Sequence, residues 1–388
     1  MKRNSFGVVS AAALILLAGC GSEPAANGQA PDGQTTAPAT TSEATYTLTE
    51  VATGFDFPWA MAFLPEGGFL VSERDGFVSY VAPDETSGTR LGGTPDTLVA
   101  GQGGYLGLAL HPEFETNRLV YLAYSKGTQA SNSTALMRAR LSDDNLSFED
   151  AEDIYVAETK RATSAHYGGR ILFLPDDTML LSLGDGFRYM EAAQSPENTH
   201  GTIVRLTLDG DIPDDNPYAD GEGGLPEVYS YGHRNVQGLA YDAATGTIYE
   251  HEHGPKGGDE INILEPGLNY GWPAITYGVN YDGSIITTQT EAPGMEQPIV
   301  KWVPSIAPSG MVFYTGDVYP EWKGDLLVSA LAGSKVQRVD LENGRVKGEH
   351  AYFEDERMRF RDIEQGPDGY LYLLVDEPGA PIMRIEPN

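Results

Sequence analysis

Hydrophobic and polar positions alternate through most of the chain after residue 45, and one pattern recurs six times. Each copy has an apolar run, a turn containing Pro, Asp or Gly, and a second apolar run. Period-two alternation around a turn predicts a β-hairpin, and no stretch of this region keeps a helical period for a dozen residues. The predicted hairpins cover residues 60–71, 108–122, 171–183, 238–250, 310–328 and 363–374.

Six hairpins in one uninterrupted body predict an all-β fold, namely a six-bladed β-propeller. The roughly 340 residues that carry them give a little under 60 residues per unit, slightly more than the about 40–50 of a four-stranded blade. Long loops between blades are therefore expected. A β-sandwich or two smaller β domains are the alternatives, and they are disfavoured because no second linker-like stretch interrupts the body.

Composition supports this interpretation and removes one class of partner. The chain has 46 Gly, 25 Pro and 21 Tyr, which suit tight turns and strands. Its formal net charge is -31, from 25 Lys and Arg against 56 Asp and Glu. Binding of phosphate backbones needs clustered cations, so no nucleic-acid partner is expected. A hydrophobic content of 40% is sufficient for a core.

The N-terminus has the features of a bacterial lipoprotein signal. Lys2 and Arg3 precede an apolar stretch shorter than the about 20 residues of a bilayer span, and Leu17-Ala18-Gly19-Cys20 resembles the lipobox. We expect residues 1–20 to be the signal peptide and Cys20 to be the lipidation site; a plain signal peptide or a transmembrane anchor is the alternative. Cys20 is the only cysteine, which excludes an internal disulfide and a multi-cysteine metal site.

The next segment, residues 21–44, consists mainly of Ala, Thr, Ser, Pro, Gly and Gln. Such a composition cannot bury enough apolar surface to order a chain, so a flexible tether is expected there, followed by the propeller at 45–388. The lipid is the only expected membrane contact. It would hold the protein outside the cytoplasm, on the periplasmic side in a bacterium with two membranes.

Polar clusters that interrupt the hairpins are the candidates for function, because propeller sites are built from loops at one mouth of the central channel. His166 precedes the third hairpin and Asp185 follows it, so the turn brings both to one end. A carboxylate on one imidazole nitrogen leaves the other nitrogen free as a general base. The same pair also occurs in proteins as a structural feature.

Three arginines suggest an anion site. Arg359 and Arg361 flank Phe360 in a run of alternating character, so both guanidinium groups face one side. In so acidic a chain this favours an anionic ligand, most simply carboxylates bound bidentately, although salt bridges to Asp and Glu are the alternative. Arg234 and Asn235 add a third cation and an amide, or else form a structural turn.

The run from His253 to Glu260 is rich in Gly and ends in Asp259 and Glu260. Backbone carbonyls and carboxylates are the ligands that Ca²⁺ prefers, so calcium is the expected metal, and a metal-free acidic turn is the alternative. Neither EF-hand spacing nor HExxH-like zinc spacing occurs in the sequence.

In this order, the motifs resemble the soluble quinoprotein aldose and glucose dehydrogenases, which use pyrroloquinoline quinone (PQQ) on a six-bladed propeller. The resemblance runs from about Pro58 to Pro387. It rests on GQGG around Gln102, GHRN at 232–235, HGPKGGDEIN at 253–262, and then NYGWP, WVPSIAPSGM and RFRD. Each motif alone is weak, but the ordered set is highly specific.

The resemblance implies roles for the matched residues. His166 is implied as the general base for the anomeric hydroxyl of the sugar, oriented by Asp185, and Gln102 as a substrate contact. The implied catalytic set also includes Arg234. The implied cofactor contacts are Arg234, Asn235, Asp259, Arg359 and Arg361. Calcium beside the cofactor is implied at the carbonyls of Gly254 and Pro255, and a second, structural calcium at Glu260 and the Tyr270 carbonyl.

One position departs from the resemblance. After Val328, glucose dehydrogenases carry a Lys that pairs with PQQ, and the aligned residue here is Ala332. Lys335 follows three residues later, but on a strand its side chain would point elsewhere. A missing cation predicts a weaker hold on a tricarboxylate.

The expected function is therefore PQQ- and calcium-dependent oxidation of an aldose sugar at its anomeric carbon to the lactone, with electrons passed to a quinone, a cytochrome or a dye. One alternative is a calcium-dependent propeller lactonase or gluconolactonase, which has no need for three arginines at the mouth. The other is a non-catalytic sugar- or protein-binding propeller lipoprotein, against which His166, Asp185 and Gln102 argue.

Overall fold

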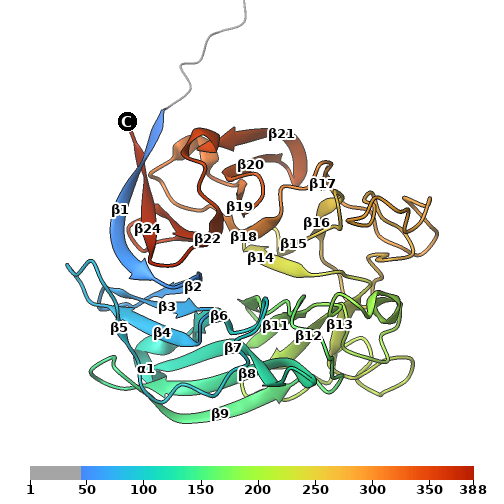
Figure 1. Cartoon of the computed structure of the whole chain (residues 1–388), viewed down its shortest axis with the longest axis horizontal. Helices are drawn as coiled ribbons and strands as arrows, with labels where there is room; N and C mark the ends of the chain where they lie inside the picture. Colours follow the sequence, from blue (N-terminus) through green and yellow to red (C-terminus); the bar gives the residue numbers. More distant parts are fainter. Residues whose placement is uncertain (1–44) are drawn as a thin grey trace, which may run out of the picture. The chain divides into compact units, whose positions relative to one another are not determined.

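The computed structural model describes residues 45–388, which form six four-stranded antiparallel sheets around a common centre (Figure 1). The predicted six-bladed β-propeller is confirmed. Cys20, the signal peptide at 1–20 and the tether at 21–44 lie outside the described residues. Within residues 45–388, no helix combines the length and apolar character needed to cross a membrane.

Five blades each consist of four strands that are consecutive in the chain. Blade 1 contains β2 (Pro58–Phe63), β3 (Phe69–Glu73), β4 (Phe77–Val81) and β5 (Thr89–Arg90). Blade 2 contains β6 (Tyr105–Leu110), β7 (Leu119–Thr128), β8 (Ser131–Leu141) and β9 (Phe148–Val156). Blade 3 contains β10 (Ile171–Phe173), β11 (Thr178–Leu183), β12 (Thr202–Thr207) and β13 (Val228–Tyr231). Blade 4 contains β14 (Val236–Asp242), β15 (Thr247–Glu252), β16 (Asp259–Ile263) and β17 (Val300–Trp302). Blade 5 contains β18 (Pro308–Phe313), β19 (Leu326–Ala330), β20 (Lys335–Glu342) and β21 (Arg345–Tyr352).

Blade 6 joins the two ends of the body. Its strands are β22 (Phe360–Gln365), β23 (Leu371–Val375), β24 (Ala380–Pro387) and β1 (Tyr46–Phe55). β1 pairs antiparallel with β24 from Tyr46 opposite Pro387 to Phe55 opposite Ala380. In Figure 1 the blue β1 lies beside the red β24. The ring is thus closed by backbone hydrogen bonds between the first and last strands of the described chain.

Between residues 45 and 388, helical structure is limited to short connections. These are α1 (Phe114–Asn117) and the 3-10 helices η1 (Met190–Gln194), η2 (Pro320–Trp322) and η3 (Glu354–Glu356). The six predicted hairpins are the first two strands of the six blades, β2–β3, β6–β7, β10–β11, β14–β15, β18–β19 and β22–β23. The period-two interpretation of these segments is therefore confirmed.

The core lies between the faces of neighbouring blades. Leu70 on β3, Leu122 on β7 and Leu181 on β11 belong to one buried cluster that joins three successive blades. Strands in these blades are covered on both faces, which explains their nearly continuous apolar runs. Contacts between successive first strands, from β2 through β22 and back to β2, complete the ring around the channel.

The first strands of five blades carry a shift of register close to their N-terminal ends. The shifts leave Trp59, Leu106, Gln237, Ser309 and Arg361 outside the regular pairing. A bulge of this kind turns the extra side chain out of the alternation of the strand. It does so at the end of the channel where the polar motifs of the sequence lie.

Because β1 closes the ring, a cavity beside it in blade 6 should strongly lower the stability of the propeller. Phe55 of β1 is 1% exposed and packs in a cluster with residues of blades 1 and 6. We expect Phe55→Ala to lower the free energy of unfolding by about 3–5 kcal/mol, measured by urea denaturation. Ile285→Ala, at a side chain that is 66% exposed, is the control and should change it by less than about 0.5 kcal/mol. Equal effects would contradict the role assigned to β1.

Candidate functional site

The loops and bulges at the N-terminal ends of the first strands surround a cavity of about 220 Å³. The predicted residues on its wall are Gln102, Asn235, Arg359 and Arg361. The wall also contains side chains that the sequence interpretation did not select, namely Trp59, Arg74, Tyr167, Gln237, His253 and Asp376. The bulges contribute four side chains to the cavity wall, namely Trp59, Leu106, Gln237 and Arg361.

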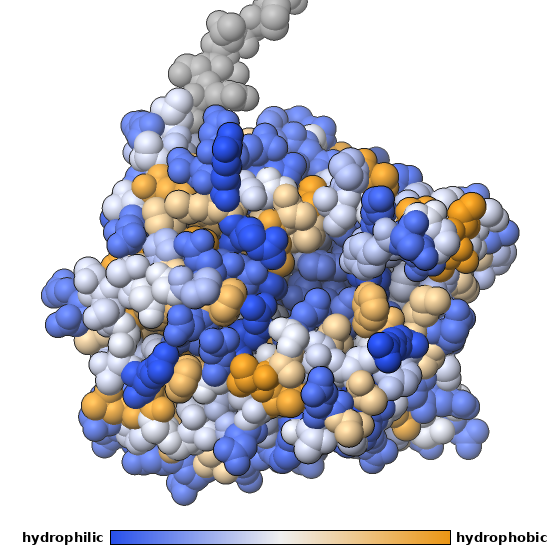
Figure 2. Space-filling view, in the orientation of Figure 1, coloured by the Kyte–Doolittle hydropathy of each residue, from blue (hydrophilic) through white to orange (hydrophobic). Residues whose placement is uncertain are grey.

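A second hollow, of about 700 Å³, lies at the C-terminal ends of the same strands and contains none of the predicted site residues. Its wall combines aromatic side chains, Phe63, Phe173 and Phe313, with the polar side chains of Arg170, Glu364 and Gln365. Figure 2 shows that the centre of the visible face is hollowed and bordered mostly by hydrophilic residues. The predicted residues Gln102, Asn235, Arg359 and Arg361 thus line only the smaller cavity, at the N-terminal ends of the strands.

His166 and Asp185 form the predicted pair. The His166 Nδ1 atom lies 2.6 Å from Asp185 Oδ1, and both side chains are buried. The second carboxylate oxygen accepts a hydrogen bond from the indole of Trp272 at 2.9 Å, and the first also accepts one from the Phe187 amide at 2.7 Å. These donors fix the carboxylate, which in turn makes Nδ1 the protonated nitrogen of the imidazole. Nε2 is then the basic nitrogen.

The electrostatic environment keeps His166 neutral. Burial lowers the pKa of His166, the Arg234 guanidinium lowers it further, and Asp185 acts in the opposite direction. Burial would raise the pKa of Asp185, but the hydrogen bond and charge of His166, together with Arg234, hold that pKa below its usual value. A neutral imidazole beside an ionised carboxylate is the state required of a general base.

The backbone of His166 is held in an uncommon conformation. Its φ of 52° lies in the left-handed region, which a residue with a Cβ rarely adopts. Gln102 Oε1 accepts a hydrogen bond from the His166 amide at 2.7 Å, and the buried Arg161 donates to the His166 carbonyl at 2.5 Å. Gln102 and Arg161 therefore hold the backbone of His166 at its amide and its carbonyl. Arg161 was missed by the sequence interpretation because only its burial reveals the role.

Three guanidinium groups gather on the cavity wall. Asp376 lies 3.1 Å from Arg359, 3.7 Å from Arg74 and 3.9 Å from Arg361. Burial would raise the pKa of Asp376, but Arg361, Arg74 and Arg359 outweigh burial and lower it. The expectation that Arg359 and Arg361 face one side agrees with their shared position on this wall.

Arg361 is the most deeply buried of these arginines. It is 7% exposed, and its Nε atom is buried without a hydrogen-bond partner among the described residues. One terminal nitrogen donates to Gln237 Oε1 at 3.3 Å. Burial lowers the pKa of Arg361 to about 10, which still leaves it charged at neutral pH. Three cations facing one carboxylate form a site with capacity for an added anion.

Arg234 and Asn235 lie in the turn before β14. Arg234 is buried and donates to the carbonyls of His253 at 3.1 Å and Gly254 at 2.8 Å. Asn235 accepts a hydrogen bond from the Gly168 amide at 3.1 Å and lines the cavity. The turn therefore joins blade 3 to the Gly-rich run that follows β15.

Asp259 supports that run from behind. Its carboxylate accepts hydrogen bonds from the amides of Gly254, Ile306 and Ala307 and from the Ser305 hydroxyl, at 2.7–3.0 Å. Asp259 is fully buried and is not on the cavity wall, whereas Ala307 is. The residue predicted as a cofactor contact is thus placed as an organiser of the loops that carry such contacts.

Three of the four predicted metal residues, Gly254, Glu260 and Tyr270, line a small void that shares His253 with the cavity wall. This void has a volume of about 10 Å³, and Arg234 also lines it. Burial, with the charge of Glu252, raises the pKa of Glu260 to about 8.

Lys335 begins β20 and its ammonium lies 3.8 Å from Glu354, so its side chain points away from the cavity, as expected from its place on a strand.

Two exposed aromatic side chains stand next to the histidine. The Phe187 ring meets that of His166 edge to face, with centroids 5.1 Å apart, and stacks on Tyr281 at 6.5 Å. Phe187 and Tyr281 are 48% and 61% exposed. Exposed aromatic rings beside buried polar groups offer an apolar surface for a ligand.

Comparison with known proteins gives the relatives of the chain. The family model described as glucose/sorbosone dehydrogenase matches residues 55–384. The aldose sugar dehydrogenase YliI of Escherichia coli is 38% identical over 337 residues, which cover 86% of this chain and 91% of that protein.

Two solved structures extend the comparison. The soluble aldose sugar dehydrogenase from Escherichia coli in its apo-form has a TM-score of 0.86 at 37% identity, covering 89% of this chain and 100% of that one. The PQQ-bound form of the aldose sugar dehydrogenase from Streptomyces coelicolor has a TM-score of 0.73 at 28% identity, covering 88% and 98%.

The environment of His166 makes a titration prediction. We expect more than half of its imidazole to be neutral at pH 6.5, since burial and Arg234 lower its pKa below the usual value of about 6.5. Asp185→Asn should lower this pKa further because it removes the charge that favours the imidazolium. Nitrogen-15 NMR of histidine-labelled protein measures both, with the exposed His350 as the reference signal. A higher pKa in the Asp185→Asn variant would contradict the assignment.

Proposed function

The chain belongs to the glucose and sorbosone dehydrogenase family and is an oxidoreductase that acts on sugars, and we propose that it oxidises aldose sugars at the anomeric carbon to the lactone in a PQQ- and calcium-dependent reaction. The observation that carries this proposal is the His166–Asp185 pair beside a cavity with an excess of guanidinium groups. The first feature suits proton removal, and the second suits an anionic cofactor.

The residues present fit PQQ. Its carboxylates require fixed cations, and the wall has Arg74, Arg359 and Arg361 facing the single carboxylate of Asp376. The buried Nε of Arg361 has no hydrogen-bond partner within residues 45–388, although Asp376 lies 3.9 Å away, and it is a donor available to such a group. Arg74 supplies a cation on the wall, whereas Ala332 stands at the position where the resemblance implies a lysine. The name of the PQQ-bound Streptomyces coelicolor relative supports the same cofactor.

The residues also fit calcium. The carbonyls of Gly254 and Pro255 are hard oxygen donors of the kind that calcium takes, and Glu260 with the Tyr270 carbonyl offers a second set of such donors. When bound, PQQ supplies the two-electron acceptor and Ca²⁺ supplies the Lewis acid that polarises it.

The chain's own residues account for the movement of the proton. Oxidation to the lactone removes a proton from the anomeric hydroxyl and a hydride from the anomeric carbon. His166 Nε2 receives the proton, and Asp185 stabilises the imidazolium that results. Gln102 holds the His166 amide through Oε1, which leaves its NH₂ group for a sugar hydroxyl. Phe187 covers one side of the imidazole and limits access of water to it.

The proposal includes a location and an electron acceptor. Lipidation at Cys20 would hold the propeller outside the cytoplasm on the tether of residues 21–44. An external quinone, cytochrome or dye would take up the two electrons. A lactonase would leave the gathering of Arg74, Arg359 and Arg361 without a function, so the oxidation is the better-supported activity.

Reconstitution tests the proposed function. The purified full chain, stripped of metal and cofactor with a chelator, should reduce a dye in the presence of glucose or another aldose only after both PQQ and Ca²⁺ are added. His166→Gln should lower kcat by roughly 10²–10⁴-fold, because it removes the general base. PQQ affinity, measured by absorbance titration, should be unchanged in this variant. Full turnover by His166→Gln would contradict the assignment of His166 as the general base. Turnover without added PQQ would contradict the assignment of PQQ as the cofactor.

The arginine cluster predicts a separate loss of cofactor affinity. Arg361→Ala should weaken PQQ binding by about 10–100-fold, since a hydrogen bond to a charged group contributes about 1.5–3 kcal/mol. Isothermal titration of the metal-loaded protein measures this loss. Arg90→Ala, at a half-exposed arginine outside the cavity, is the matched control and should bind normally. Unchanged affinity for Arg361→Ala would return that residue to a structural role.

A further inference from the structure

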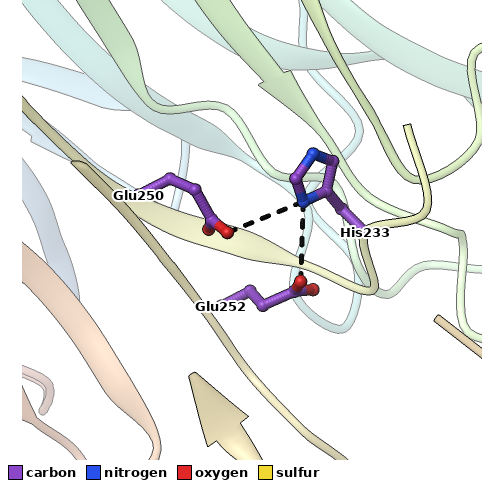
Figure 3. A group of neighbouring side chains, drawn as sticks. All are labelled: His233, Glu250 and Glu252. Carbon is purple, nitrogen blue, oxygen red and sulfur yellow. Dashed lines mark ion pairs between the residues drawn. The ribbon is translucent and has the colours of Figure 1, made fainter. Parts of the chain in front are cut away.

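A group of three ionisable side chains behind the cavity has no place in the proposed reaction. His233 lies in the turn between β13 and β14, and Glu250 and Glu252 lie on β15. The two glutamates are two residues apart on one strand, so their side chains leave the same face of the sheet. Figure 3 shows both carboxylates directed towards the imidazole of His233. The three residues offer ligand atoms that all lie within 4.8 Å of one another.

These groups are buried and incompletely satisfied. His233 and Glu250 have no exposed surface, and Glu252 is 4% exposed. His233 Nδ1 and Glu250 Oε2 have no hydrogen-bond partner within residues 45–388. Buried polar atoms without partners are costly and rare in folded proteins. The geometry therefore calls for a group between the imidazole and the carboxylates.

The distances fit a shared metal ion better than direct hydrogen bonds. His233 Nδ1 lies 3.5 Å from Glu252 Oε1 and 3.7 Å from Glu250 Oε1. Two ligand atoms that each bind one ion at about 2.1 Å with a tetrahedral angle are about 3.4 Å apart. The observed separations are close to that value.

The charges favour a cation as well. Glu250, Glu252 and Glu260 lie close together, and Asn262 donates to the carboxylates of Glu250 at 2.7 Å and Glu260 at 3.4 Å. Among the described residues, neither Glu250 nor Glu252 forms a salt bridge with an Arg or Lys side chain. Several carboxylates without a cationic partner are stable in a buried place only when protonated or bound to a cation.

The imidazole is oriented as a metal ligand. Ser230 Oγ lies 2.8 Å from His233 Nε2, and the Tyr270 ring stacks on the imidazole with centroids 4.6 Å apart. A hydrogen bond from Nε2–H to the serine leaves Nδ1 unprotonated, facing the carboxylates. Metal-binding histidines commonly have an outer partner of this kind.

We propose that His233, Glu250 and Glu252 bind one divalent transition-metal ion of the Zn²⁺ class. An imidazole nitrogen with two carboxylates suits such an ion, whereas calcium takes oxygen ligands. Its three ligands differ from those implied for calcium, and Glu252 also lines the small void beside Glu260 and Tyr270. Glu252 also accepts a hydrogen bond from the Arg234 amide. The ion therefore ties β15 to the turn that carries Arg234 and Asn235 and stabilises one side of the cavity.

Metal analysis tests this site without reference to activity. The full chain is stripped of metal with a chelator and dialysed against Zn²⁺ with excess Ca²⁺. Its zinc content is then measured by inductively coupled plasma mass spectrometry. We expect one zinc per chain and a higher Tm than in the zinc-free protein. Glu250→Gln, which keeps the shape but loses the charge, should bind zinc more than about 10-fold more weakly, since loss of even an outer partner costs about 10–100-fold. Glu73→Gln, at a glutamate of blade 1 that is only 1% exposed, is the control and should retain zinc.

Two results would overturn the proposal: a parent protein that retains no zinc, and an equal loss of zinc in both variants. If Glu250→Gln fails to fold, anomalous scattering at the zinc edge from crystals of the zinc-loaded parent decides. A peak at bonding distance from His233 Nδ1 supports the site. A map at saturating zinc without that peak contradicts it.

Discussion

The pairing of β1 with β24 is the interaction on which the site depends. Each blade contributes a different part of the cavity: Trp59 comes from blade 1, Asn235 precedes blade 4, and Arg361 comes from blade 6. Neighbouring blades contact one another mainly through apolar faces, which hold two sheets together but do not close a ring. The antiparallel ladder from Tyr46 to Phe55 supplies that closure. The relative positions of the blades, and so of the polar groups around the channel, follow from it.

Within the closed ring, buried carboxylates set the positions of the functional loops. Asp185 fixes the imidazole of His166, and Asp259 gathers the backbone amides of two loops. A buried carboxylate is costly unless its oxygens accept several hydrogen bonds, and each of these two carboxylates does. The same condition makes the arrangement rigid, because any loop movement would leave a buried charge without donors. Pre-organisation of the site is thus a consequence of satisfying buried acids.

Sequence reasoning predicted the local features well and the long-range ones in part. The hairpins were predicted because period-two alternation is set by the strand itself, and the same rule gave the direction of Lys335. Trp59 and Gln237 were missed because they are bulge residues, where the alternation that predicts side-chain direction breaks down. Arg74 and Asp376 were missed for another reason: each stands in a loop without a motif, and only the closed ring brings them together.

Asp376 lies among the arginines of the cavity and reduces the repulsion between them. Burial, opposed by Asp376, lowers the pKa of Arg361, and Arg74 and Arg359 lower it further, so the arginines repel one another. One shared carboxylate offsets part of this repulsion while no ligand is bound, and it leaves most of the positive charge uncompensated. With a formal net charge of -31, the chain as a whole repels anions at long range. Screening limits that repulsion to about 8–10 Å at physiological ionic strength. Recognition of an anionic cofactor must therefore arise inside the cavity, from the fixed directions of the guanidinium groups.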